Sequence, residues 1–128
     1  MNSFPESPNT VLFAFNDIEN PPDLTVRPMP ANILRRLFRQ YLIPVTAFEK
    51  RQDLEELDAA AREEHERCVQ ARDEVRAMYC LSNLAVLAKV RGELANARKL
   101  AEDSRQLAGR LGFADVAKEM QKLLTPAS

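Results

Sequence analysis

Beyond residue 30, apolar residues recur along the chain at the three- and four-residue spacing of a helix. From Ala31 to Leu42 they fill one half of a helical wheel, and Arg35, Arg36 and Arg39 cluster on the other half. The apolar positions are Ile33, Leu34, Leu37, Phe38, Tyr41 and Leu42. Pro30 suits the first turn of a helix, so we predict a helix over 31–42 with one buried face and one solvated basic face.

The next helical run starts after Pro44 and continues to Arg91 with neither glycine nor proline. The letters TAFE at 46–49 have the pattern of a capping box, which predicts a helix start. One helix of about 45 residues would be roughly 70 Å long, well beyond the roughly 35 to 40 Å width of a domain of this size. The run is mostly charged at first and mostly apolar later. We predict an amphipathic helix over 47–76 and a buried helix over 77–91, either collinear or folded back.

The charged half of this run carries an apolar stripe at close to heptad spacing. Its positions are Leu54, Leu57, Ala61, Cys68, Ala71, Val75 and Met78. Most of these side chains are small and Glu64 interrupts them, whereas a strong coiled coil carries more leucine. The first part of the stripe, Leu54, Leu57 and Ala61, is our candidate for an exposed surface that contacts a partner protein.

Glycine divides the C-terminal part of the chain into two further helices, predicted over 94–110 and 113–124. Gly92 and Gly112 stand where a helix commonly ends in a left-handed residue. The buried stripe of the last helix is Phe113, Val116, Ala117, Met120, Leu123 and Leu124. The predicted fold is therefore all-α, with four to five helices arranged as antiparallel hairpins or a bundle over residues 31–125.

The hairpin around Gly92 resembles a tetratricopeptide repeat, a family of 34-residue helical hairpins stacked side by side. The matching positions are Leu84, Ala85, Gly92, Ala97 and Ser104, within about residues 78–111. The chain departs from the family at Leu81, Ala88, Ala101 and Gly109, where a tryptophan-like residue, two aromatics and a proline are usual. No second copy is visible upstream, so the resemblance implies a hairpin with a capping helix and, more weakly, a groove that binds peptides.

The first 30 residues form a proline-rich arm in which regular structure is discouraged. The exception is TVLFAF at 10–15, which predicts one short strand presenting Val11, Phe13 and Phe15. A lone strand is not stable in water, so we expect it to pack on the helices or to pair with another chain. The N-terminus lacks the basic region of a secretory signal, and we expect a cytoplasmic protein.

Charge and hydropathy narrow the classes of partner. Eighteen basic and nineteen acidic residues give a net charge of -1, so the strong positive field of a nucleic-acid-binding protein is absent. No apolar run reaches the roughly 18 to 20 residues of a membrane-spanning helix. We therefore do not expect nucleic acid as the main partner, and we expect no transmembrane segment.

The sequence carries no pattern typical of catalysis or metal binding. The one histidine, His65, lies one helical turn before Cys68, but a structural zinc site needs four ligands. Cys80 would lie about 18 Å further along a continuous helix. The acidic pair Glu63 and Glu64 lies among arginines, as on an ordinary solvated face. We predict no catalytic residues, no cofactor and no metal.

These observations predict a protein-binding module without enzymatic activity, such as an adaptor, a secretion-type chaperone or a regulatory subunit. The proposed surface combines Val11, Phe13 and Phe15 with Leu54, Leu57 and Ala61. Two alternatives stay open. One is a nucleic-acid-binding regulator that uses the basic face of 31–42, and the other is a homodimer or larger homo-oligomer that serves as a structural component.

Overall fold

The computed structural model describes residues 30–125, and over this range the chain is helical and contains no strand. The prediction of a helical fold is confirmed for these residues. The elements are α2 (Ala31–Leu37), the short 3-10 helix η2 (Val45–Ala47), α3 (Leu54–Gln70), α4 (Glu74–Val90), α5 (Leu94–Leu111) and α6 (Ala114–Leu124). None of these helices combines the length and apolarity needed to cross a membrane. The predicted strand, with Val11, Phe13 and Phe15, lies outside the described residues.

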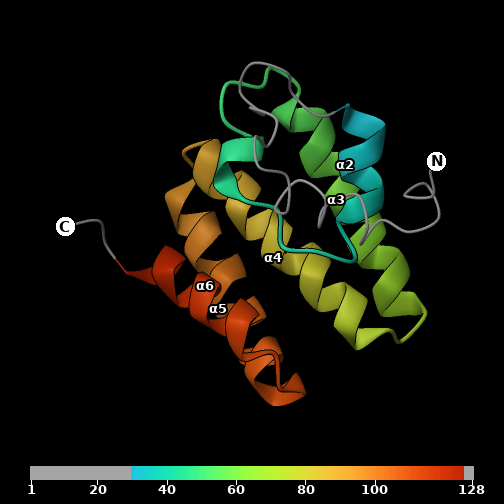
Figure 1. Cartoon of the computed structure of the whole chain (residues 1–128), viewed down its shortest axis with the longest axis vertical. Coiled ribbons are helices and arrows are strands. Elements are labelled where there is room, and N and C mark those ends of the chain that lie inside the picture. The colour runs from blue at the N-terminus through green and yellow to red at the C-terminus, as the bar shows by residue number, and fades with distance from the viewer. Residues whose placement is uncertain (1–29, 126–128) are drawn as a thin grey trace, which may run out of the picture.

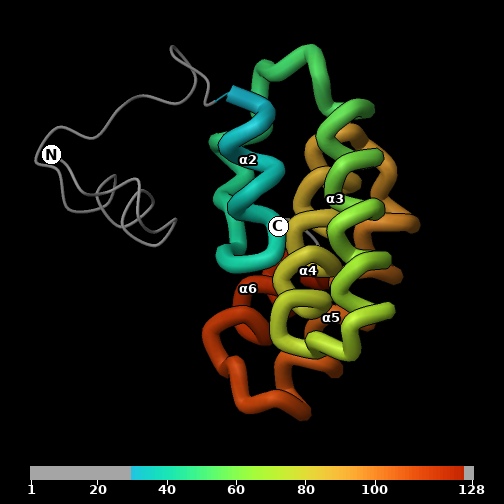
Figure 2. Tube along the Cα trace, turned by 90° about the vertical axis from the view of Figure 1, so that its right-hand side faces the viewer, coloured from blue at the N-terminus to red at the C-terminus, as the bar shows by residue number. Residues whose placement is uncertain are grey.

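Helices α3 to α6 run up and down, and each packs against the next (Figure 1). The central helix is α4, which contacts α3, α5, α6 and η2, while α2 lies alongside α3 (Figure 2). Because neighbours cover α4 on several sides, it is buried without interruption from Ser82 to Ala88. Its nearly continuous apolar sequence is the pattern of a helix covered on several sides.

The helix predicted over 47–76 is wrong at both ends. It begins only at Leu54 and ends at Gln70, and the chain then folds back so that α4 packs antiparallel to α3. The turn depends on Arg72, which adopts a left-handed conformation with φ of 58°. The Arg72 N–H donates to the Val69 carbonyl at 3.0 Å, and the Asp73 N–H donates to the Cys68 carbonyl at 2.9 Å. These two bonds form a Schellman turn, which normally uses glycine.

The capping box predicted at Thr46 is absent, because Thr46 lies within η2 and no side chain caps that helix. The chain instead buries Phe48, whose ring centroid lies 6.3 Å from that of Phe38. Arg51 and Asp53 then pair at 2.8 Å just before α3 begins. Burial of the aromatic ring therefore outweighs the local helix signal and delays the start of α3.

The Schellman turn recurs at Gly92 and Gly112, so the left-handed residues of these three turns are spaced twenty residues apart. At each turn the residue four positions before the left-handed residue accepts the backbone hydrogen bond that spans more of the chain. These residues are Cys68, Ala88 and Ala108, and all three are buried. Small side chains at this position allow successive helices to approach closely at the turn. Helices α3 to α6 are therefore joined by one turn geometry used three times.

A single side chain, Asn83 of α4, holds the segment between α2 and η2. Its Oδ1 accepts a hydrogen bond from the Ile43 N–H at 2.8 Å. Its Nδ2 donates to the carbonyls of Phe38 at 2.9 Å and Tyr41 at 2.7 Å. Asn83 is fully buried, so the buried amide, and not water, is the hydrogen-bond partner of these backbone groups. The helix predicted over 31–42 therefore ends at Leu37, since Asn83 supplies the partners that a longer helix would have supplied.

We expect Asn83→Ala to lower the free energy of unfolding by about 2–4 kcal/mol, because it leaves three backbone groups of the Phe38–Ile43 segment without their partner. Urea denaturation followed by circular dichroism measures the change. The control is Asn96→Ala on α5, at a half-exposed position, which should stay within about 0.5 kcal/mol of the parent. Equal effects of the two substitutions would contradict the role given to Asn83.

The turn at Arg72 predicts a stabilising substitution. Arg72→Gly should raise the free energy of unfolding by about 1 kcal/mol, because glycine adopts a positive φ without the steric cost paid by arginine. The reciprocal change, Gly92→Arg, should cost about the same, since a Cβ at Gly92 meets no atom within 4 Å and only the backbone conformation opposes it. Thermal unfolding of both variants tests the pair, and a destabilised Arg72→Gly protein would count against the turn assignment.

Candidate functional site

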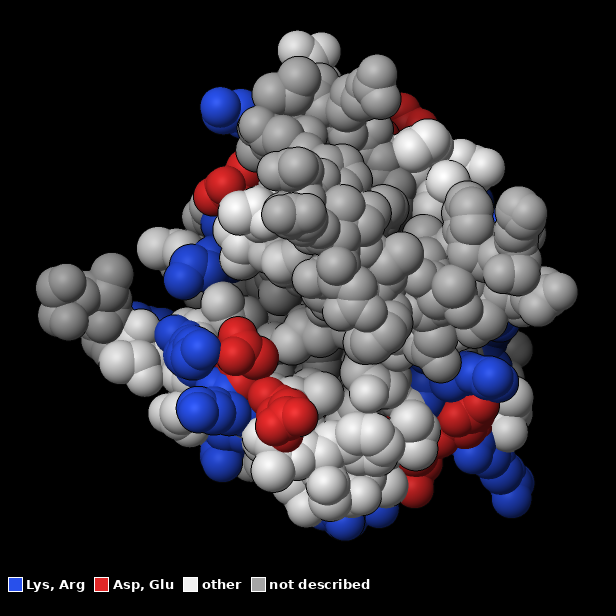
Figure 3. All heavy atoms as spheres, in the orientation of Figure 1, with Lys and Arg blue, Asp and Glu red and all other residues white. Residues whose placement is uncertain are grey.

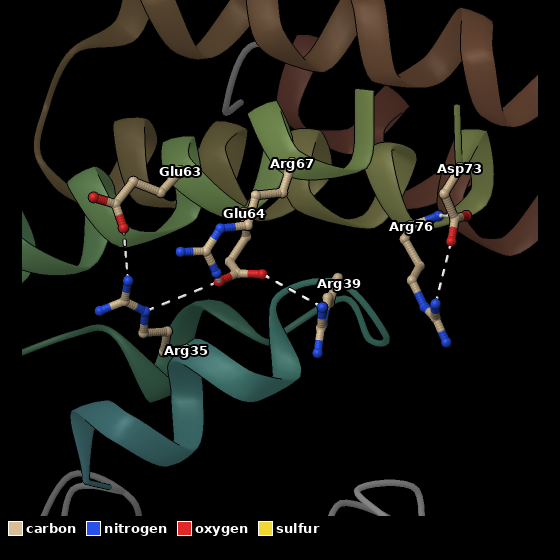
Figure 4. Close-up of polar contacts among 7 residues, drawn as sticks. All are labelled: Arg35, Arg39, Glu63, Glu64, Arg67, Asp73 and Arg76. Atoms are coloured by element: carbon tan, nitrogen blue, oxygen red, sulfur yellow. Dashed lines mark hydrogen bonds and ion pairs between the residues drawn. The ribbon is translucent and has the colours of Figure 1, made fainter. Parts of the chain in front are cut away.

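The predicted basic face on and after α2 is partly neutralised by carboxylates of α3 (Figure 4). Arg35 pairs with Glu63 at 2.6 Å and also lies 4.0 Å from Glu64. Arg39 lies 3.7 Å from Glu64, and Arg67 approaches the same carboxylate to 3.1 Å. Two of the three arginines singled out from the sequence therefore face acidic partners, and Arg36 is exposed. This arrangement fits attachment of α2 to α3 better than a track for phosphates.

Glu64 is the unexpected member of this network, because the sequence indicated a solvated acidic face. Its side chain is only 7% exposed and lies where α2 crosses α3. The long arginine side chains reach it while keeping 44–66% of their own surface in water. A carboxylate buried to this degree is stabilised only when cations compensate its lost hydration. The surrounding arginines provide that compensation and fix how α2 lies on α3.

The predicted partner surface at the start of α3 is wrong. Leu57 is 1% exposed and Ala61 is fully buried, and both belong to the hydrophobic core. Leu54 is partly buried and packs against the same core. The stripe was predicted to be exposed because no pattern in the sequence indicated that the chain folds back at Arg72. With α4 packed against α3, these side chains are covered.

Charges of both signs are mixed on the described part of the face shown in Figure 3. Basic and acidic side chains lie next to one another at its left and at its lower right. This alternation agrees with the net charge of -1. A charged ligand must therefore be recognised by local groups rather than by a field of the whole protein.

A pocket opens beside the turn between α3 and α4, and we call it the turn pocket. It has a volume of about 560 Å³, within the range of pockets that hold a ligand of drug size. Its lining comes from the end of α3, the start of α4 and the end of α5. The lining residues are His65, Cys68, Val69, Arg72, Asp73, Glu74, Ala77, Leu107 and Arg110.

Most charges around the turn pocket already have partners. Arg110 pairs with Glu74 at 2.6 Å, and this contact lowers the pKa of the Glu74 carboxyl. Asp73 accepts from the Arg76 N–H at 3.1 Å and pairs with the Arg76 guanidinium at 3.2 Å. Arg72 makes no ion pair or hydrogen bond through its side chain to any described residue. It is therefore the lining cation still available to a ligand.

Apolar side chains line the turn pocket together with Arg72. Val69 is 52% exposed and lines the turn pocket, and Val75 is also exposed just beyond the turn. The third exposed large hydrophobic residue among those described is Leu94, at the opposite end of the helices, after the α4–α5 turn. Inside the pocket Leu107 and Ala77 add apolar wall. Burial lowers the pKa of His65, so its imidazole adds no stable positive charge near neutral pH.

The two cysteines are brought together, contrary to the separation expected for a continuous helix. Because α4 folds back on α3, Cys68 and Cys80 lie near enough for each thiol to affect the pKa of the other, and both are buried. Burial raises the pKa of each thiol above its ordinary value. Cys68 lines the turn pocket, but its protonated thiol is a poor nucleophile. Over residues 30–125 no cluster of three or more histidine, cysteine or acidic side chains has an arrangement that could hold a metal.

Comparison of the chain with protein-family models, with curated proteins and with solved structures finds no match. The resemblance of the α4–α5 hairpin to a tetratricopeptide repeat therefore stays a prediction. Of the residues that carry it, Gly92 forms the left-handed turn and Ala97 is buried. Ser104 is buried and hydrogen-bonded to Ser82 of α4, so this position joins the two helices of the hairpin.

The raised pKa values of the thiols predict that stability falls at alkaline pH. An unfolded cysteine ionises near pH 8.5, whereas the buried thiols of the folded protein stay protonated. Above that pH the unfolded state binds fewer protons, and the free energy of unfolding should fall by up to about 1.4 kcal/mol per pH unit for each thiol. Urea midpoints between pH 7.5 and 9.5 test this. The variant Cys68→Ala/Cys80→Ala should have a clearly shallower slope, and identical slopes would contradict the prediction.

Proposed function

We propose that the protein is a binding module without catalytic activity that recognises another protein, as an adaptor, a secretion-type chaperone or a regulatory subunit. The observation that carries this proposal is the turn pocket. It places an exposed valine and apolar walls next to one arginine that has no partner among the described residues. Arginine is enriched among the residues that dominate binding energy at protein interfaces, and such residues cluster in well-packed pockets.

The groups in the pocket are better suited to holding a side chain than to moving protons. Cys68 is kept protonated by burial, and Glu74 is engaged by Arg110. Asp73 is occupied at the start of α4, where it caps the helix. A ligand can therefore be recognised by the shape of the pocket, by apolar contact and by the charge of Arg72. These are the means by which binding surfaces select partners.

Rigid support adds to the proposal. The pocket is built from three packed helices, with the Schellman turn at Arg72 joining α3 to α4 and an exposed ion pair between Glu74 and Arg110 bridging α4 and α5. Sites held by packed helices keep their geometry better than sites on loops. The predicted similarity to tetratricopeptide repeats, which present binding surfaces on stacked hairpins, is consistent with the same function.

The experiment compares partner capture by two matched variants. Val69→Asp places a charge at the turn pocket, whereas Leu94→Asp places one at the opposite end of the helices, at a residue of similar exposure (52% and 62%). We expect Val69→Asp to reduce the recovery of a specific partner by about tenfold or more, since loss of an apolar anchor costs more than about 1.4 kcal/mol. Quantitative mass spectrometry of proteins captured by the tagged full-length chain measures the recovery.

Leu94→Asp should leave that recovery unchanged. Both variants lie on exposed positions and should unfold at a denaturant concentration close to that of the parent. The proposal is rejected if parent, Val69→Asp and Leu94→Asp recover the same proteins in the same amounts.

A further inference from the structure

The conformation of Arg72 sets this residue apart from its counterparts in the other turns. The second and third Schellman turns use Gly92 and Gly112, which adopt a positive φ at little cost. The first turn uses arginine in the same conformation, with φ of 58°, and a non-glycine residue there costs about 1–2 kcal/mol. Strain retained at one of three equivalent positions indicates that the side chain has a use that glycine could not serve.

The surroundings of Arg72 indicate what that use is. The other charged side chains that line the pocket, Asp73, Glu74 and Arg110, are held in ion pairs. The guanidinium of Arg72 makes no such contact with any described residue, so a ligand meets one uncompensated positive charge. A carboxylate complements a guanidinium with two parallel hydrogen bonds, an arrangement that lysine or a neutral donor cannot reproduce.

The rest of the lining determines what must accompany the carboxylate. Val69, Ala77 and Leu107 provide apolar surface, and the pocket has room for one large apolar side chain together with the residues beside it. A free anion such as inorganic phosphate would leave this surface uncovered. An apolar residue adjacent to an acidic one would use both features at once.

We infer that the turn pocket binds an acidic segment of a partner protein, in which an aliphatic or aromatic side chain enters the pocket and a neighbouring aspartate or glutamate pairs with Arg72. This inference rests on the proposed function and specifies the chemistry of the partner. It assigns Arg72 as the residue that determines specificity and Val69 as the apolar contact at the rim of the pocket.

Peptide titration of the ¹⁵N-labelled full-length protein tests the inference. The probes are short peptides of sequence acetyl-Ser-X-Glu-Ser-amide, with X as Leu, Met or Phe, and the matching peptides with Gln in place of Glu. We expect saturable amide shifts at Val69, Arg72 and Leu107, and a dissociation constant at least about fivefold lower for the glutamate peptide of the best pair. That preference should shrink when the salt concentration rises from 50 to 500 mM.

The decisive variant is Arg72→Gly, because it removes the guanidinium while relieving the turn. It should bind the Glu and Gln peptides equally, with an unfolding midpoint no lower than that of the parent. Arg36→Gln, which removes an exposed arginine of α2, should keep the full preference for glutamate. Loss of the preference in both variants would mean that net charge, and not Arg72, provides it, and would overturn the inference.

The outcomes separate the inference from the function on which it rests. Equal binding of Glu and Gln peptides at the pocket of the parent protein overturns the acidic preference but leaves the pocket as a protein-binding site. Retention of the preference in Arg72→Gly overturns the role of Arg72 alone. Absence of saturable shifts at the turn pocket with all six peptides overturns both the inference and the use of this pocket.

Discussion

The structure depends on the side-chain amide of Asn83. The segment between α2 and η2 leaves the helical conformation, and its backbone groups face the most buried helix of the protein. Buried backbone groups must be paired, and one amide provides an acceptor and two donors in a fixed plane. By pairing these groups, Asn83 removes the cost of burying them against α4. It also determines where α2 ends. No apolar residue at this position could do the same.

The second constraint is the turn repeated at Arg72, Gly92 and Gly112. Each turn reverses the chain, and the small residue four positions before it lets the next helix pack closely. The repetition places α4 against both of its sequence neighbours and, together with η2 and α6, covers it on several sides. It also creates the turn pocket, because the reversal at Arg72 brings the end of α3 beside the start of α4 and the end of α5. The pocket thus follows from the same geometry that forms the core.

Charge acts locally in this protein. Glu64 is buried beneath α2 and compensated by arginines, so the basic face of α2 contributes to the attachment of that helix. At the surface, an exposed ion pair between Glu74 and Arg110 bridges α4 and α5. Around the turn pocket the other charged side chains are engaged in such pairs, so a guanidinium without a partner among the described residues gains discriminating power there. Arg72 has that position, and it holds it in a backbone conformation that favours glycine.

The sequence by itself determined the helical class, the buried character of α4 and the ends of helices at Gly92 and Gly112, because these depend on local periodicity and on backbone freedom. It also indicated that a helix of 45 residues was too long, but not where it breaks, since Arg72 is not a residue that usually ends a helix.

Only the tertiary structure decided that the chain reverses at Arg72, that Leu57 and Ala61 are core, that Glu64 is buried and that Cys68 meets Cys80. Each of these outcomes depends on which surfaces the reversal brings together. Contacts between residues far apart in sequence, such as those of Asn83 with the Phe38–Ile43 segment, leave no periodic signal in the chain, because their free energy is gained only once the helices are packed.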